Sequence, residues 1–134
     1  MRLTHLADYA VVMMTAAARR GPDARLSATE LSDDTGVPLP TAQKVMQRLA
    51  LAGLLIGQRG AGGGYALAKS VPDITLADII EAVEGPFELT QCASNDGPSD
   101  CALDAHCRVK PHMSVVGDAV RGALGAVSLE ELAR

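Results

Sequence analysis

The spacing of apolar residues predicts a chain built mainly from helices. Between His5 and Arg20, apolar side chains recur every three or four positions, which is the helical period, and Gly21 and Pro22 then end the segment. A methionine pair in this run, Met13 and Met14, falls on the apolar side. We therefore expect a first helix that contributes methionine to the core.

Two further helices are predicted close together. Ser27 to Glu30 forms a capping box at the start of a short helix over 28–35, and Gly36 ends it. A third helix is expected over 40–52, before Gly53. Its apolar residues fall on one side, leaving a polar and partly basic face made of Thr41, Gln43, Lys44, Gln47 and Arg48. This arrangement is typical of a helix-turn-helix that binds DNA.

A β-hairpin is predicted directly after the third helix. Residues 54–59 and 65–69 have the composition of strands, and a glycine-rich turn over 60–64 joins them. A phosphate-binding loop is the weaker interpretation, because these glycines precede a strand and no Gly-Lys-Ser/Thr follows. A hairpin here is the wing of a winged helix, with Arg59 entering its tip, where it can reach the minor groove.

The remaining apolar pattern predicts three more helical segments. One covers 74–83, capped by Thr75, and another begins near Pro111. A short capped helix follows over 128–132. The long segment carries an apolar stripe of Val115, Val116, Ala119, Val120, Ala123 and Leu124. This stripe either docks on the first helix of the same chain or forms a homodimer interface, and DNA binding favours the homodimer.

All three cysteines lie between the last two long helical segments, at Cys92, Cys101 and Cys107. The residues around the first two are polar turn formers, which argues against thiols that are simply buried in the core. An odd number of cysteines cannot all pair in disulfides within one chain. The cluster of thiols therefore predicts a metal or iron–sulfur site.

Composition narrows the class of protein. The chain has 134 residues with 48% hydrophobic and 2% aromatic content, so we expect one compact domain with an aliphatic core. We find no apolar run of membrane-spanning length and no secretory pattern. We therefore expect a cytoplasmic protein with no membrane partner, in a reducing compartment that keeps cysteines as thiols.

Charge is distributed unevenly along the chain. The net charge is −4, but residues 1–70 hold eight basic and five acidic residues, a balance of +3. Residues 71–134 hold four basic and eleven acidic residues, a balance of −7. Only the first half is therefore suited to follow the phosphates of double-stranded DNA.

Taken together and in order, several segments make the chain recognisable. These are Met1-Arg2-Leu3-Thr4, Asp8-Tyr9-Ala10, the helix-turn-helix, Arg59-Gly60-Ala61-Gly62-Gly63-Gly64-Tyr65 and the three late cysteines. The chain resembles the IscR/NsrR family of winged-helix transcription regulators that sense iron–sulfur clusters, and most resembles its regulators of the SUF cluster-assembly operon. The resemblance implies a DNA-binding region over 1–84, a cluster-binding loop over 85–110 and a dimerisation region over 111–134.

The resemblance also implies functional residues. Cys92, Cys101 and Cys107 are expected to hold the cluster, with a [2Fe–2S] cluster favoured and a [4Fe–4S] cluster as the other form. In the family's iron–sulfur assembly regulators the fourth ligand is a histidine three residues after the last cysteine, and that position is Lys110 here. The candidates for the fourth ligand are, in order, Asp8 from the partner subunit, His112 and His106. The residues expected at an operator are Arg2, Ser27, Thr41, Gln43, Lys44, Arg48 and Arg59.

Other functions are also compatible with the sequence. The chain shows no Ser-His-Asp, paired-carboxylate or Walker pattern, so we expect no enzyme and no small-molecule substrate. A nitric-oxide-sensing repressor of the same family is one alternative. A zinc regulator using the three cysteines with His112 is another, and a metal-free thiol regulator acting by disulfide exchange is a third.

Overall fold

The computed structural model describes residues 2–60, 63–90 and 106–134. Two of the predicted cluster ligands, Cys92 and Cys101, and part of the wing turn lie outside the described residues. The elements follow in the order α1 (His5–Arg19), α2 (Ala28–Thr35), α3 (Leu39–Leu51), β1 (Leu55–Gly57), β2 (Tyr65–Leu67), the short 3-10 turn η1 (Val71–Asp73), α4 (Leu76–Glu84), α5 (Lys110–Gly125) and α6 (Leu129–Leu132). This order confirms the predicted fold class, mainly α with one β-hairpin.

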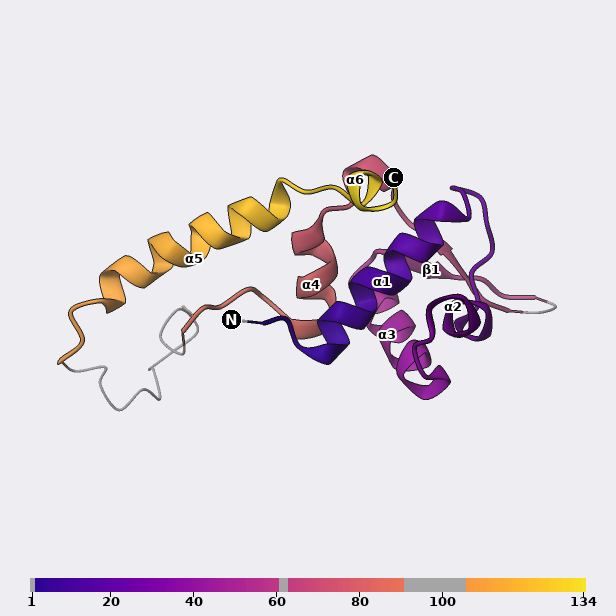
Figure 1. The fold of residues 1–134 in the computed structure, drawn as a ribbon, viewed down its shortest axis with the longest axis horizontal. Coiled ribbons are helices and arrows are strands. Elements are labelled where there is room, and N and C mark those ends of the chain that lie inside the picture. The colour runs from indigo at the N-terminus through magenta and orange to yellow at the C-terminus, as the bar shows by residue number, and fades with distance from the viewer. Residues whose placement is uncertain (1, 61–62, 91–105) are drawn as a thin grey trace.

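The molecule is elongated, with the hairpin and α5 at opposite ends (Figure 1). Helices α1 to α4 and α6 form one packed body, and α5 extends away from it. No helix in the described part of the chain has the length and apolar character that crossing a membrane requires.

Side-chain caps set the starts of several helices, and the one at Ser27 was predicted. The hydroxyl of Thr4 accepts a hydrogen bond from the amide of Ala7 at 3.1 Å and begins α1. Ser27 caps α2 in the same way by accepting from the amide of Glu30 at 3.1 Å. The Glu30 carboxylate instead accepts from Arg20 at 2.9 Å, so the structure has the serine half of the predicted capping box.

Arg20 joins the end of α1 to α2 through two carboxylates. Its guanidinium donates to Asp34 as well as to Glu30. The hydrogen bond to Asp34 is the main cause that raises the pKa of Arg20 above its usual value. The side chains are between 28% and 56% exposed, so these pairs orient the two helices more than they stabilise the fold.

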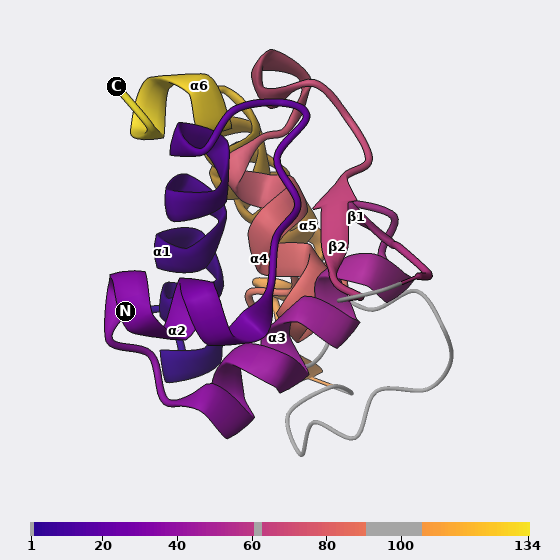
Figure 2. The ribbon, with the colours of Figure 1, turned by 90° about the vertical axis from the view of Figure 1, so that its right-hand side faces the viewer.

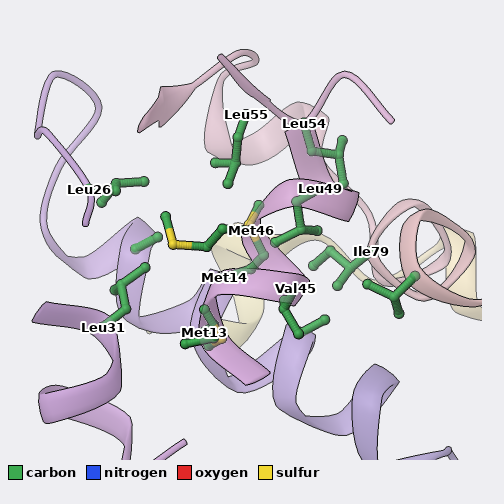
Figure 3. Close-up of a cluster of buried hydrophobic side chains, with 14 of the residues drawn as sticks. Met13, Met14, Leu26, Leu31, Val45, Met46, Leu49, Leu54, Leu55 and Ile79 are labelled. Atoms are coloured by element: carbon green, nitrogen blue, oxygen red, sulfur yellow. The ribbon is translucent and has the colours of Figure 1, made fainter. Parts of the chain in front are cut away.

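The core is aliphatic and rich in methionine, as the composition predicted. Met13, Met14 and Met46 are almost completely buried between α1, α3 and the hairpin (Figure 3). Leu26, Leu31, Val45, Leu49 and Ile79 complete the central layer. The methionine pair of the first helix is therefore part of the core, as expected.

The hairpin is shorter than predicted and has an additional backbone partner. Its antiparallel register pairs Leu55 with Leu67 and Gly57 with Tyr65. Leu26, which precedes α2, forms an isolated bridge with Tyr65. The wing is thus fixed at its base to the chain that enters the helix-turn-helix.

Helix α6 packs on the body, whereas α5 reaches the core through the partly buried Leu124 near its end. Leu129 is completely buried, and its amide donates to the carbonyl of Ile74 at 2.7 Å. In contrast, α5 has no buried residue, and Val115 and Val116 are 68% and 42% exposed. The stripe is therefore open to solvent at Val115 and Val116, whereas Leu124 near its end packs against the core of the same chain.

Candidate functional site

Helix α3 has one face in the core and the other in solvent. Ala42, Val45 and Met46 are completely buried, whereas Gln43, Lys44 and Gln47 are exposed. Pro40 lies in the first turn, where its missing amide hydrogen costs no hydrogen bond. The exposed side chains can donate to and accept from base edges without disturbing the core.

A pocket of about 420 Å³ lies between α2, α3 and the hairpin. Figure 2 shows α3 with α2 on one side and the strands on the other. The lining residues are Ser27, Ala28, Gln43, Gln47, Gly64 and Tyr65. The polar face of α3 therefore borders a concave surface formed together with the base of the wing.

Gln47 is missing from the operator contacts expected from the sequence. Gln47 is exposed and lines the same pocket as Gln43. It follows Gln43 by about one helical turn. Residues four positions apart lie on the same face of a helix, so the sequence spacing of Gln43 and Gln47 could have predicted this placement. We add Gln47 to the candidate interface.

The other predicted contact residues lie around this surface in different settings. Arg2 and Arg59 are exposed, and Thr41 is half-exposed at the start of α3. The Ser27 hydroxyl is engaged as the cap of α2. Arg59 follows Gln58, whose amide donates to Gly64 at 2.8 Å and whose side chain accepts from Arg25 at 3.2 Å. Arg59 is therefore the first residue after the hydrogen-bonded part of this arm of the hairpin.

Arg48 differs from the other predicted contacts. It is half-buried, and its Nη1 donates to the main-chain carbonyl of Val83 at 2.6 Å. Val83 lies in the last turn of α4, so this guanidinium reaches toward α4. The sequence placed Arg48 with the solvent-facing residues because its partner is 35 positions away along the chain.

Cys107 is the one predicted cysteine ligand among the described residues. Cys107 has a free, half-exposed thiol, and its two histidine neighbours in sequence, His106 and His112, are exposed. Asp8 is exposed in the first turn of α1. Thiolate, imidazole and carboxylate are the donors that iron and zinc sites use.

These candidate ligands are not brought together within one described chain. Among residues 2–60, 63–90 and 106–134, no group of three or more His, Cys, Asp or Glu side chains is arranged to hold a metal ion. The other two predicted cysteine ligands, Cys92 and Cys101, lie outside the described residues.

Comparison with known proteins decides the family. A family model described as "Rrf2: Iron-dependent Transcriptional regulator" matches residues 3–134. The chain belongs to the Rrf2 family. The HTH-type transcriptional regulator IscR of Photorhabdus laumondii subsp. laumondii is 32% identical over 132 residues, covering 98% of this chain and 79% of that protein. IscR of Photobacterium profundum is 31% identical over 134 residues, covering 100% of this chain and 76% of that protein.

Solved structures similar to this Rrf2 protein support the fold. CymR, the global cysteine regulator of B. subtilis, superposes with a TM-score of 0.72 at 24% identity and covers 99% of this chain and 96% of its own. IscR of T. potens superposes with a TM-score of 0.70 at 23% identity and covers 98% of this chain and 85% of its own. At these identities the likeness establishes the winged-helix fold alone.

Membership of the Rrf2 family makes this chain a DNA-binding transcriptional regulator. The prediction of a regulator in place of an enzyme is thereby confirmed. The exposed face of α3, the adjoining pocket and the hairpin are the candidate surface for this function.

Proposed function

We propose that this Rrf2 protein is a homodimeric regulator that binds operator DNA and senses an iron–sulfur cluster. The observation that carries the proposal is the exposed row of Gln43, Lys44 and Gln47, in an Rrf2 chain whose cysteines all follow α4. The genes under control are proposed to be those of SUF-type cluster assembly or of the response to iron and redox stress.

Operator reading is assigned to α3 and the wing. Gln43 is suited to pair with adenine through its amide, and Lys44 and Gln47 extend the contact along the major groove. Arg59 enters the minor groove from the hairpin. Arg2, Ser27 and Thr41 are assigned to the phosphate backbone, which fixes the register of the protein on DNA.

The exposed stripe of α5 is proposed as the homodimer interface. Val115 and Val116 are large apolar side chains in solvent on a helix without buried residues. A second copy of the same helix would cover them through a two-fold interface. Such a dimer presents two α3 helices to two half-sites, as winged-helix and related regulators do.

Cys92, Cys101 and Cys107 are proposed to hold the cluster, with [2Fe–2S] preferred over [4Fe–4S]. Asp8 of the partner subunit is the first choice for the fourth ligand, followed by His112 and His106. When bound, a cluster supplies an iron centre that iron shortage and oxidants can remove. Holding it would fix the relative pose of the two α3 helices and shift the population of DNA-binding conformations. Three thiol ligands also fit the reducing cytoplasm.

Metal and sulfide analysis tests the proposal. Protein purified without oxygen is expected to contain iron and acid-labile sulfide in equal amounts, with visible absorption. Cys107→Ser should lose both, whereas Ser114→Ala, on the exposed side of α5, should keep them. Zinc in place of iron, or no metal at all, would contradict the cluster proposal and leave the DNA-binding assignment standing.

A further inference from the structure

The last turn of α4 is held from two sides by side chains distant in sequence. On one side, Nη1 of Arg48 from α3 donates to the carbonyl of Val83 at 2.6 Å. On the other side, the hydroxyl of Thr4 donates to the carboxylate of Glu84. Two consecutive residues of α4 are thus connected to the recognition helix and to the start of α1.

The Arg48 contact supplies what the end of α4 lacks. Carbonyl groups in the last turn of a helix have no donor within the helix, and they carry its negative partial charge. No basic residue of α4 itself lies in its last turn. Arg48 therefore contributes a charged donor to the Val83 carbonyl from another helix. A charged hydrogen bond of this kind is stronger and more specific in geometry than a neutral one.

The Thr4 contact joins the same turn to the candidate ligand Asp8. Thr4 caps α1, and its carbonyl accepts the amide of Asp8 at 3.0 Å. Thr4 both caps α1 and binds Glu84. A movement of the end of α4 would therefore also move the first turn of α1. Asp8 and Arg48 are thereby connected through Val83 and Glu84.

Open grooves border this turn on both sides. One groove of about 460 Å³ lies toward α3 and includes Arg48, Leu51 and Gly85 in its lining. Another of about 450 Å³ lies toward α1 and includes Thr4, Glu84 and Phe87. Val83 and Ile80 anchor this part of α4 in the core. The two polar contacts add directed ties from the same turn to α3 and to α1.

Gly85 ends α4 with a positive φ of 84°, and the chain then continues toward Cys92. A change in the path of the chain beyond Gly85 acts first on the turn that Arg48 holds. We propose that Arg48 is a positioning residue, which transmits the state of the cysteine segment through Val83 to α3 in place of contacting DNA. The inference rests on the proposed function. It also assigns to Glu84 and Thr4 the connection from the same turn of α4 to Asp8.

The ratio of operator affinities with and without cluster is the readout for this role. Couplings of this kind typically change affinity by about 5- to 150-fold. In Arg48→Met, which keeps the apolar stem, we expect the ratio to fall to within about twofold of one. Iron and sulfide per chain should remain as in the wild type, because Arg48 is not a ligand. Arg48→Lys, which keeps a charged donor, should preserve most of the ratio.

Two further variants make the test specific. Glu84→Ala should also lower the ratio, although Glu84 lies outside the polar face of α3. Arg20→Met is the matched control, since it removes an arginine that joins α1 to α2 and should leave the ratio unchanged. If Arg48→Met does not fold, Glu84→Ala decides, and an unchanged ratio in it overturns the inference.

Other results separate this inference from the proposed function. If Arg48→Met weakens both forms equally and lowers the salt slope by about one, Arg48 contacts a phosphate and the inference is wrong. A wild-type ratio that Arg48→Met leaves intact overturns the inference alone. Wild-type protein without iron and sulfide overturns the cluster proposal and, with it, this coupling.

Discussion

Leu26 and Tyr65 exchange a pair of backbone hydrogen bonds. The amide of each donates to the carbonyl of the other, and both distances are 2.7 Å. Leu26 directly precedes Ser27, the cap of α2, so the base of the wing and the start of the helix-turn-helix move as one unit. This pairing sets the relative position of the two elements assigned to the grooves of DNA.

Gly64→Ala should break this pairing. Gly64 has a φ of +115°, and an added Cβ would lie 2.7 Å from the carbonyl oxygen of Leu26. We expect a loss of about 1–3 kcal/mol in unfolding free energy, measured by denaturant titration, together with weaker operator binding. Gly63→Ala is the control, because its φ is +53° and no atom lies near the added carbon. Its loss should be about 1 kcal/mol, and an equal loss in both variants would contradict the role of the Leu26 contact.

Arg59→Ala should weaken operator binding by about 1–3 kcal/mol if the wing enters a groove. The exposed guanidinium lies beyond the paired part of the hairpin, so its removal should leave the fold intact. Binding measured over a range of salt concentrations checks both the affinity and the number of ionic contacts. Lys69→Ala, at the opposite end of the hairpin, is the charge-matched control, and equal effects of the two variants would refute the wing assignment.

Gln43→Ala should change which operator sequences bind. An amide side chain pairs with adenine through two hydrogen bonds, so its loss should relax selection at one base pair at a cost of about 1–3 kcal/mol. Selection of sites from random-sequence DNA measures this for wild type and variant. An unchanged preference at every position would remove Gln43 from base reading, and Gln47→Ala then identifies whether the next turn of α3 has this role.

Val116→Asp should dissociate the dimer without unfolding the body. Val116 is 42% exposed and α5 has no buried residue, so the single chain loses no core packing. Sedimentation should report a monomer, and the helical circular dichroism should change little. Asp118→Asn, on the opposite side of α5, should remain dimeric. A dimeric Val116→Asp protein would place the interface elsewhere.

Leu129→Ala should destabilise the whole body. This side chain is completely buried in the core cluster, although it belongs to the last helix of the chain. We expect a loss of about 2–5 kcal/mol in a single unfolding transition. A loss below about 0.5 kcal/mol, the range of ordinary surface substitutions, would show that α6 is not part of the core.

Local rules predicted the helices and the presence of the hairpin. Thr75 and Ser128 cap their helices as expected, and Gly36 ends α2 with a φ of 83°. These features depend on residues a few positions apart, so they can be predicted from the local sequence.

The missed features depend on long-range contacts. The Leu26–Tyr65 pairing, the Arg48–Val83 hydrogen bond and the Thr4–Glu84 hydrogen bond join residues far apart in sequence. A single residue that bridges to a strand has no alternating pattern of its own. An arginine on a helix face has the same signature whether it faces DNA or a neighbouring helix. For this reason Arg48 was expected at the operator, whereas its donor reaches α4.

In the proposed regulator, cluster occupancy changes operator affinity. The most direct measurement compares one protein preparation before and after chelation of its iron, with iron, sulfide and operator affinity determined on both samples. We expect iron and sulfide in equal amounts at the start and an affinity change of at least about fivefold when both are removed. Equal affinities in the two samples, or a starting protein that contains zinc in place of iron and sulfide, would contradict the claim.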